Sequence, residues 1–256
     1  MNNNYKITGS IVVFKENLED LNTTIECFLN IPFSTKLYLI DNTPDRFFEY
    51  VFNDKRIEYL GVEENIGFGP AHNKILHKIR NNSNFHLVLN PDVSFSETVI
   101  PNLISELKKD ENIAMIAPKV LFQNGSHQFS CRRYPNAIEL IVRRFYFLKL
   151  FFRNIIYKGE YREKDLSKPF FAEYLTGCFQ LYNTIDFVQL NGFDERYFLY
   201  MEDVDICKKI DNLGKKKLYY PQEEIIHILK QGSLKEINLF FSHLTSAIKY
   251  FLKWGF

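Results

Sequence analysis

The chain has 256 residues, 46% of them hydrophobic, which is enough to fill the core of one large domain or two small ones and excludes an intrinsically disordered chain. The formal net charge is +1, from 32 basic and 31 acidic residues, so the overall charge gives no reason to expect nucleic-acid binding. The four cysteines form no C-x-x-C pair, so neither a zinc site nor a disulfide framework is indicated and a reducing cytoplasm is favoured.

The beginning of the sequence lacks the apolar core of a signal peptide. No stretch has the roughly 18 uncharged apolar residues of a spanning helix. These features predict a protein that is soluble or that lies on a membrane without crossing it.

Strands and helices alternate through the first half of the chain. Asn17 and Ser96 are suitable N-caps for the first and last of its helices, because their side chains can accept hydrogen bonds from the first turn. This alternation predicts a doubly wound, mainly parallel α/β sheet. Apolar runs predict strands at residues 7–14, 36–40, 57–60, 85–89 and 113–117, and helical spacing predicts helices at 17–29, 71–80 and 96–109.

Residues 85–93, with the sequence FHLVLNPDV, are the most informative stretch of this half. Leu87 to Leu89 is a continuous apolar run, as in a strand that is buried on both faces of a parallel sheet. Pro91 cannot donate to the sheet and ends the strand, so Asp92 lies just beyond its carboxyl edge, where open α/β sheets bind ligands. A carboxylate there can hold a divalent metal against a phosphate, although a simple polar turn would have the same sequence.

Polar segments also follow the second and third predicted strands. Asp41 ends the second strand, and residues 63–70, EENIGFGP, follow the third. Two glycines before a proline at a helix start leave backbone N–H groups free and allow a ligand to approach closely. The spacing differs from the G-x-G-x-x-G fingerprint, so a dinucleotide-binding fold is less favoured.

Two aromatic and basic stretches in the second half have helical periodicity. In residues 138–156 the apolar residues form one stripe, and the basic residues lie off it. Residues 237–256 can form a similar helix, with Lys253 and Trp254 near its end. Each helix either packs on its own domain or lies on an anionic lipid surface.

The segment between these stretches contains a second candidate carboxylate. A strand interrupted by Gly177 is predicted at 171–181, a helix from about residue 200 to Gly214, and a last strand at 216–220 that His227 follows closely. Asp203 lies one turn before the buried stripe of that helix and on the same face, so it is either a helix cap or a general base. A lone histidine such as His227 is either structural or a ligand.

Together these segments resemble the family 2 glycosyltransferases with a GT-A fold, and among them the bacterial rhamnosyltransferase-like enzymes of O-antigen and related surface polysaccharide biosynthesis. The resemblance runs from Ile11 to about Gly232. Its most specific part is the spacing between Gly-Phe-Asp-Glu and Glu-Asp. The matching segments are LIDN at 39–42, ENIGFG at 64–69 with Asn73, LNPD at 89–92, TGCF at 176–179, NGFDE at 191–195 and EDVD at 202–205.

The resemblance implies a role for each site residue. Asp203 would be the general base, with Glu202 beside it in the catalytic site. Asp92 and His227 would ligate Mg²⁺ or Mn²⁺ on the donor diphosphate. The more common metal motif of the family is Asp-x-Asp, and Asn90 in place of its first Asp leaves one charged ligand fewer. The residues that would bind the nucleotide sugar are Phe14, Glu16, Asp41, Asn42, Asn65, Gly67, Asn73, Asn90 and Asp92.

The resemblance also implies inverting transfer of rhamnose or another hexose from a dTDP- or UDP-linked donor to a polyprenyl-diphosphate-linked or oligosaccharide acceptor. Such an enzyme would be cytoplasmic and peripheral, on the anionic inner face of the cytoplasmic membrane; homodimer formation stays open. A single GT-A domain is expected, with a Rossmann-like nucleotide-sugar-binding half at 1–118, an acceptor-binding and catalytic half at 119–232 and a C-terminal amphipathic helix at 233–256.

Two other classes of protein are weighed against this interpretation. A catalytically inactive nucleotide-sugar or glycan-binding module of the same fold would have no need of Asp203 in addition to Asp92. A nucleotidyltransferase would be expected to have a Gly-rich loop with Arg and Lys after the first strand, whereas residues 14–17, FKEN, contain no glycine. The sequence therefore favours a glycosyltransferase.

Overall fold

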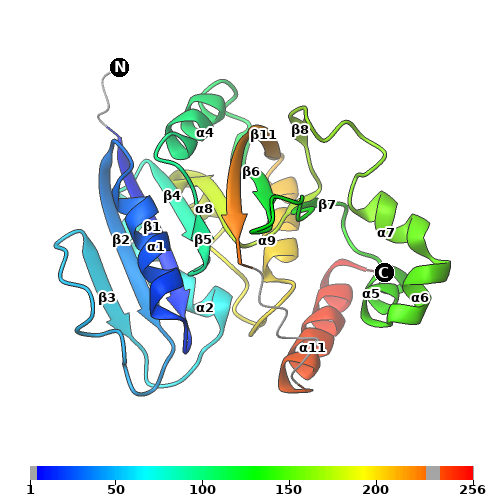
Figure 1. Cartoon of the computed structure of the whole chain (residues 1–256), viewed down its shortest axis with the longest axis horizontal. Helices are drawn as coiled ribbons and strands as arrows, with labels where there is room; N and C mark the ends of the chain where they lie inside the picture. The colour runs from blue at the N-terminus through cyan, green and yellow to red at the C-terminus, as the bar shows by residue number, and fades with distance from the viewer. Residues whose placement is uncertain (1–4, 229–236, 256) are drawn as a thin grey trace.

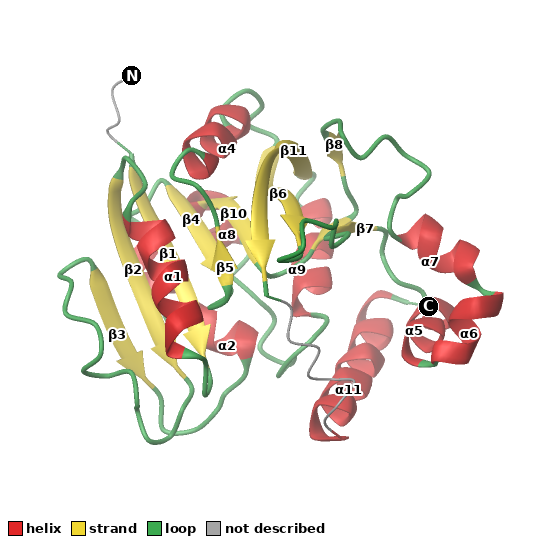
Figure 2. Ribbon diagram, viewed as in Figure 1, coloured by secondary structure: helices red, strands yellow, loops and turns green. Residues whose placement is uncertain are grey.

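A central β-sheet with helices on both faces forms the body of the protein (Figures 1 and 2). The computed structural model describes residues 5–228 and 237–255. The strand order is β3-β2-β1-β4-β10-β6-β11-β5, β8 pairs with β11, and β7 and β9 form a second small sheet. The strands are β1 Lys6–Val13, β2 Ser34–Asp41, β3 Ile57–Gly61, β4 Phe85–Leu89, β5 Val93–Ser94, β6 Ile113–Leu121, β7 Cys131–Arg132, β8 Phe170–Phe171, β9 Tyr174–Leu175, β10 Phe179–Asn183 and β11 Lys216–His227.

Most strands of the large sheet run in one direction. β3, β2, β1 and β4 pair in parallel, and so do β6 and β11. β10 is antiparallel to both β4 and β6, so these two strands also share a direction. The prediction of a mostly parallel α/β sheet is confirmed. Because β10 comes from the second half of the sequence and lies between two strands of the first half, both halves build one continuous sheet.

Helices cover both faces of this sheet. α1 and α4 pack on one face, where Phe28 and Leu103 belong to the same buried apolar core as Leu87. α2, α3, α8 and α9 pack on the other face, in a second core that includes Ile75 and Ile206. These helices are α1 Leu18–Leu29, α2 Phe68–Asn73, α3 Leu76–Ile79, α4 Val99–Leu107, α8 Thr184–Gln189 and α9 Glu202–Asn212.

Of the two predicted N-caps, Asn17 is present and Ser96 is not. Asn17 is the N-cap of α1, and its side chain accepts hydrogen bonds from the N–H groups of the first turn, as predicted. Ser96 is not the N-cap of α4: the helix begins later, after Thr98, and has no side-chain cap. The Ser96 hydroxyl instead lies 2.7 Å from the hydroxyl of Thr98. The single helix predicted at 71–80 is divided into α2 and α3.

The strands of the second half also differ from the prediction. The expected strand at 171–181 is three short strands, because β8 pairs with β11, β9 with β7, and β10 with β4 and β6. The two apolar segments at 216–220 and 225–227 belong to one strand, β11, which contains an irregularity between Tyr220 and Glu224. α8 follows β10 directly and was not predicted.

The basic stretch at 138–156 forms three short helices instead of one amphipathic helix: α5 Ala137–Arg144, α6 Tyr146–Phe151 and α7 Arg153–Gly159. Arg143 turns inward, with its Nε 2.8 Å from Glu139 Oε1 and its Nη1 2.9 Å from Glu160 Oε1. Both carboxylates are buried and need a cationic partner. Arg143 therefore does not belong with the exposed basic residues of this stretch.

α11 Ile237–Trp254 is fixed to the start of α9. Lys253 Nζ lies 2.7 Å from Asp205 Oδ1 and 2.7 Å from Asp194 Oδ2, and Trp254 Nε1 donates to Asp205 Oδ1 over 2.7 Å. The end of α11 that carries Lys253 and Trp254 therefore packs on the protein itself, which is one of the two alternatives left open for this helix. Residues 233–236 of the predicted C-terminal segment and Gly232 lie outside the described residues. Within the described ranges, no helix is long and apolar enough to span a bilayer.

Candidate active site

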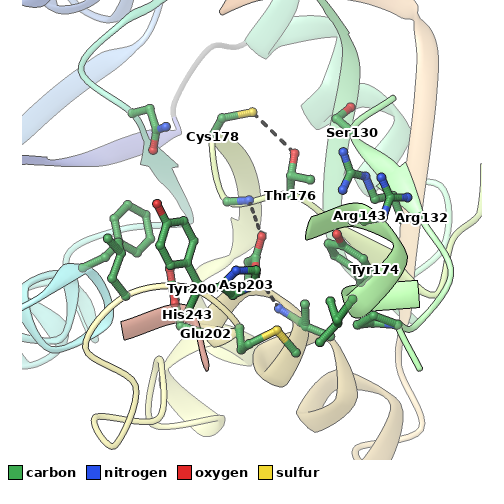
Figure 3. A pocket seen from close by; sticks show the side chains of 18 of the residues that line it. Ser130, Arg132, Arg143, Tyr174, Thr176, Cys178, Tyr200, Glu202, Asp203 and His243 are labelled. Atoms are coloured by element: carbon green, nitrogen blue, oxygen red, sulfur yellow. Dashed lines mark hydrogen bonds between the residues drawn. The ribbon is translucent and has the colours of Figure 1, made fainter. Parts of the chain in front are cut away.

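A cavity of 390 Å³ lies between the ends of β4 and β11 and the start of α9 (Figure 3). Asn90, Glu202, Asp203 and His227 are predicted site residues, and all four line it. In the sequence, Asn90 lies more than a hundred residues before the other three. The sheet and α9 therefore bring together the predicted metal-binding and catalytic segments.

Strand pairing places Asp92 beside His227. β5 is antiparallel to the end of β11, with Val93 opposite His227. Asp92 Oδ1 lies 3.3 Å from His227 Nε2, and Asn90 Nδ2 lies 3.3 Å from the same ring nitrogen. Asp92 Oδ1 is buried and has no hydrogen-bond partner among the described residues. A buried carboxylate oxygen without a hydrogen bond is costly unless a ligand completes it.

These three side chains fit a divalent cation. Mg²⁺ is usually held by one or two carboxylates together with substrate phosphates, and oxygen ligands also suit Mn²⁺. Asp92 offers the open carboxylate oxygen, His227 an imidazole nitrogen and Asn90 an amide. In the described part of the chain, no group of three or more His, Cys, Asp or Glu could hold a metal. A cation at Asp92 would therefore depend on the substrate for further ligands.

The ring of His227 is held in a fixed orientation. Its Nδ1 lies 2.7 Å from Gln128 Oε1, and Gln128 Nε2 donates to the His227 carbonyl over 3.1 Å. Burial lowers the pKa of His227, but its interactions with Cys178 and Asp92 outweigh burial and raise this pKa to about 10. Without a bound cation the ring thus favours its protonated form, and a cation would have to replace the proton on Nε2 in order to bind there.

The backbone before α9 directs Asp203 into the cavity. Tyr200 and Met201 have φ angles of 68° and 69°, in the left-handed region that costs energy for residues other than glycine. Met201 is the N-cap of α9, so Asp203 is not a simple helix cap. Asp203 Oδ2 accepts a hydrogen bond from Gly177 N at 3.1 Å, and Oδ1 accepts one from Val204 N at 2.9 Å.

Glu202 and Asp203 are adjacent acids with different surroundings. Burial, together with the charge of Asp203, raises the pKa of Glu202 well above its ordinary value, and Glu202 Oε2 is buried without a hydrogen-bond partner in the described structure. Burial also raises the pKa of Asp203, but the N–H groups of Gly177 and Val204 and the charge of Arg132 oppose this rise. Burial thus raises the proton affinity of both side chains, and only the Asp203 carboxylate has N–H groups and a nearby Arg charge that oppose this rise.

Sequence reasoning missed the basic wall of the cavity. Arg132 and Arg143 line it beside Tyr174 (Figure 3). Arg132 Nε donates to the carbonyl of Phe129 over 2.9 Å, which fixes the guanidinium next to the cavity. The sequence signals Arg132 only through the adjacent basic residues Arg132 and Arg133. The partner strand β9, which positions Arg132, could not be recognised from two residues.

Asp41 and Asn42, which are predicted to bind the nucleotide sugar, do not line this cavity and lie at the end of β2. Asp41 is fully buried; its Oδ1 accepts from Thr43 N at 2.8 Å and its Oδ2 from the Tyr59 hydroxyl at 2.9 Å. Asn42 Nδ2 donates to the Gly67 carbonyl over 3.0 Å, whereas Asn42 Oδ1 is buried without a partner in the described structure. Binding of a nucleotide by Asp41 and Asn42 stays a prediction.

The residues of the following loop make mainly internal contacts. Asn65 Oδ1 accepts a hydrogen bond from Gly67 N at 3.0 Å. A Cβ atom at Gly67 would lie 2.1 Å from the Phe198 carbonyl oxygen, and its φ of 93° also requires glycine. Asn73 Nδ2 donates to Phe193 O over 2.8 Å, and Asn73 Oδ1 accepts from Phe193 N at 2.9 Å. These contacts join α2 to the turn at 191–195.

Two further residues predicted to bind the nucleotide sugar follow β1. Phe14 is 40% exposed, and Glu16 is half-buried. Both lie at the carboxyl end of a central parallel strand, where ligands bind in open α/β sheets. Their role remains a prediction.

The fold defines the class of protein. The chain is similar to a crystal structure of GalNAc-T7 with UDP, GalNAc and Mn²⁺, with a TM-score of 0.67 over 88% of this chain and 43% of that chain. The sequence identity is 15%, so this likeness shows the fold alone. The fold is that of the GT-A glycosyltransferases.

Sequence similarity narrows this class. The chain is 27% identical over 183 residues to N-acetylglucosaminyl-diphospho-decaprenol L-rhamnosyltransferase of Mycobacterium tuberculosis, a match that covers 67% of this chain and 58% of that protein. It is 26% identical over 194 residues to rhamnosyltransferase WbbL of Escherichia coli K12, over 72% of this chain and 69% of that protein. No family model matches.

The chain thus spans a little over half the length of the mycobacterial relatives. Fold and sequence agree on a rhamnosyltransferase-like protein of glycosyltransferase family 2 with a GT-A fold, as the sequence motifs predicted.

Proposed function

We propose that this protein is a metal-dependent, inverting glycosyltransferase. It moves rhamnose or another hexose from a dTDP- or UDP-linked donor to a polyprenyl-diphosphate-linked or glycan acceptor in bacterial surface polysaccharide synthesis. The observation that carries the proposal is the single cavity in which Asp203, with its raised pKa, lies with Asn90 and His227, next to Asp92. The mycobacterial relative is named for a rhamnosyl transfer to a sugar on diphospho-decaprenol, which supports this acceptor class.

Asp203 removes the proton from the acceptor hydroxyl as the oxygen attacks the anomeric carbon of the donor sugar. The leaving nucleoside diphosphate departs from the opposite side, so the configuration at that carbon inverts. Burial disfavours a second negative charge on Glu202 and raises the proton affinity of Asp203. Asp92, His227 and Asn90 would hold Mg²⁺ or Mn²⁺, which would stabilise negative charge on the diphosphate.

The alternative is a catalytically inactive binding module of the same fold. A module that only binds nucleotide sugars needs no carboxylate of raised pKa on the acceptor side. The strained backbone at Tyr200 and Met201 also points to catalysis, because such strain persists mainly at functional sites.

The experiment is a panel of dTDP- and UDP-linked sugars, each incubated with the purified protein, Mn²⁺ and a polyprenyl-diphosphate-linked sugar acceptor. Product is measured as transferred sugar by mass spectrometry, in parallel with released nucleoside diphosphate. Transfer with at least one donor is expected. Donor binding without transfer from any donor would support the binding module instead.

We also propose that the protein is peripheral at the inner face of the cytoplasmic membrane. α6 exposes Phe147, Leu150 and Phe151 at 59%, 64% and 80%, and α7, which follows it, carries the exposed basic residues Arg153 and Lys158. Apolar and basic side chains together are the composition of interfacial helices. Each basic residue near an anionic surface contributes about 1 kcal/mol.

Sedimentation with vesicles tests this surface. The protein is expected to sediment with anionic vesicles at low salt and less at high salt, and Arg153→Ser with Lys158→Ser to reduce sedimentation. Equal sedimentation with neutral and anionic vesicles, or none with either, contradicts the proposal.

A further inference from the structure

An apolar groove lies between α5, α6 and α11, three helices that lie close together in Figures 1 and 2. Its volume is 420 Å³, within the range of small-molecule sites. Ile141 and Phe145 line one wall, and Phe240, Leu244 and Ala247 line the other. Ile141 and Leu244 are 52% and 45% exposed, so the groove is open to solvent.

The groove carries positive charge. Arg132, Arg143, Arg144 and Lys149 are among its lining residues, and no carboxylate of the described chain is. The nearby Glu139 and Glu160 are already paired with Arg143, and Glu160 also with Arg162. An apolar groove with a cationic rim suits a ligand with an apolar chain and an anionic group.

The groove is continuous with the candidate active site. Arg132, Leu140, Arg143 and His243 line both the groove and the cavity that contains Asp203. Arg143 Nη2 is buried and has no hydrogen-bond partner in the described structure, although its Nε and Nη1 are bonded. A donor of this kind, at the junction of the two spaces, is available to an anionic ligand.

The far wall of the groove is held in place. The end of α11 is bound to Asp205 through Lys253 and Trp254, and Asp205 belongs to the same helix as Asp203. Arg144 stacks on Phe240 at 4.5 Å, which joins α5 to α11 across the groove. The groove is therefore preformed, and its position relative to Asp203 is fixed.

We propose that this groove binds the isoprenoid chain of a lipid diphosphate acceptor. Arg132 and Arg143 at the junction bind its diphosphate, and the sugar attached to that diphosphate extends into the cavity with its hydroxyl at Asp203. This inference rests on the proposed function and adds the place and the chemistry of acceptor binding. It makes Ile141, Phe145 and Leu244 determinants of specificity for a lipid-linked acceptor over a free sugar.

The test measures binding of farnesyl diphosphate, inorganic pyrophosphate and farnesol to the full chain by calorimetry, without donor. Leu244→Gln and Ile141→Gln change opposite walls of the groove at partly exposed positions. Leu252→Gln is the matched control, because Leu252 lies on α11, is 78% exposed and does not line the groove. Each groove variant is expected to weaken farnesyl diphosphate binding about tenfold, in line with the loss of one buried aliphatic contact.

Tighter binding of farnesyl diphosphate than of pyrophosphate, lost in both groove variants and kept in Leu252→Gln, supports the inference. Equal binding of farnesyl diphosphate and pyrophosphate by the unmodified protein overturns it, and so does an equal effect of all three substitutions. The result is independent of the donor panel. Failure of sugar transfer with intact farnesyl diphosphate binding would therefore count against the proposed function and not against the groove.

Discussion

Asp41 and Asn73, which are predicted to bind the nucleotide sugar, differ from residues in and beside the cavity at the start of α9 in how their buried polar atoms are bonded. Both carboxylate oxygens of Asp41 and both side-chain atoms of Asn73 are used in internal hydrogen bonds. In and beside the cavity, Asp92 Oδ1, Glu202 Oε2 and Arg143 Nη2 are buried without hydrogen-bond partners among the described residues, although Asp92 Oδ1 lies 3.3 Å from His227 Nε2. Because folded proteins satisfy nearly all buried polar atoms, such a cluster marks a place completed by ligands.

This difference distinguishes residues whose polar atoms stabilise the fold from residues whose polar atoms can bind a ligand or take part in catalysis. Asn42 differs from Asp41 and Asn73, because its Oδ1 is buried without a hydrogen-bond partner in the described structure. This oxygen is therefore a predicted contact for the nucleotide.

The largest expected effect is that of Asp203→Asn. Its amide cannot accept the acceptor proton, so the transfer rate should fall about a hundredfold or more while donor affinity stays the same. Steady-state kinetics and calorimetry with the donor found in the panel check this. The control is Asp165→Asn, because the side chain of Asp165 is half-exposed and does not line the cavity; this variant should retain full activity. A mutant with more than about a tenth of the original turnover would remove Asp203 from the role of base.

Asp92→Ala should have the next largest effect. The substitution removes the carboxylate oxygen that has no hydrogen bond. Binding of a nucleoside diphosphate should therefore weaken by roughly tenfold or more when Mn²⁺ is present, and should change little when EDTA removes the metal. Calorimetry under both conditions makes each protein its own control. Equal binding by mutant and original protein in Mn²⁺ would mean that the segment at 89–92 is only a turn.

Asn73→Ala tests the scaffold side of the comparison. The substitution leaves the N–H and the carbonyl of Phe193 without partners, so stability should fall by about 2 kcal/mol with donor affinity unchanged. Urea unfolding and donor titration measure the two quantities. Asn82→Ala, at an exposed position after α3, is the control and should be nearly neutral. Lost donor affinity at unchanged stability would instead place Asn73 in the nucleotide site.

The smallest effect concerns pH. Burial lowers the pKa of His86 to about 3, and its ring nitrogens lie 2.8 Å from Thr8 Oγ1 and 3.0 Å from Ser10 Oγ. Because the folded-state pKa is below the ordinary value, the unfolded chain binds a proton below about pH 6.5 and the folded chain does not. His86 should therefore cost about 1.4 kcal/mol of stability between pH 8 and pH 5.5.

Urea unfolding at the two pH values measures this loss. His86→Gln should reduce the pH dependence, whereas His77→Gln, at an exposed position, should keep it. An unchanged pH dependence in His86→Gln would show that other groups are responsible.

The sequence predicted those parts of the fold that depend on local pattern. The strand at 85–89 and its end at Pro91 follow from apolar runs and from proline chemistry, and both are present. The helix after residue 200 was also predicted, because its buried stripe repeats at helical spacing. The family motifs placed Asn90, Asp203 and His227 in one site, and the cavity contains all three.

The parts that could not be predicted depend on long-range pairing. β9 and β7 are two residues each and have no pattern of their own, so the position of Arg132 beside the cavity was not visible. The periodicity of 138–156 suggested one continuous helix, but the backbone breaks at Phe145 and Phe152. The inward turn of Arg143 depends on Glu160, which lies beyond the amphipathic stretch.

The pairing of Val93 with His227 also has a consequence for biosynthesis. Chains emerge from the ribosome at about 5 to 20 residues per second and fold from the N-terminus, so Asp92 is synthesised well before β11 exists. Bringing together two segments so far apart in the sequence is slow, because the chain loses the entropy of loop closure before the new contacts stabilise it. In a nascent or truncated chain the proposed cation site is therefore incomplete, and any binding of Mn²⁺ at Asp92 should appear only when β11 has paired with β5.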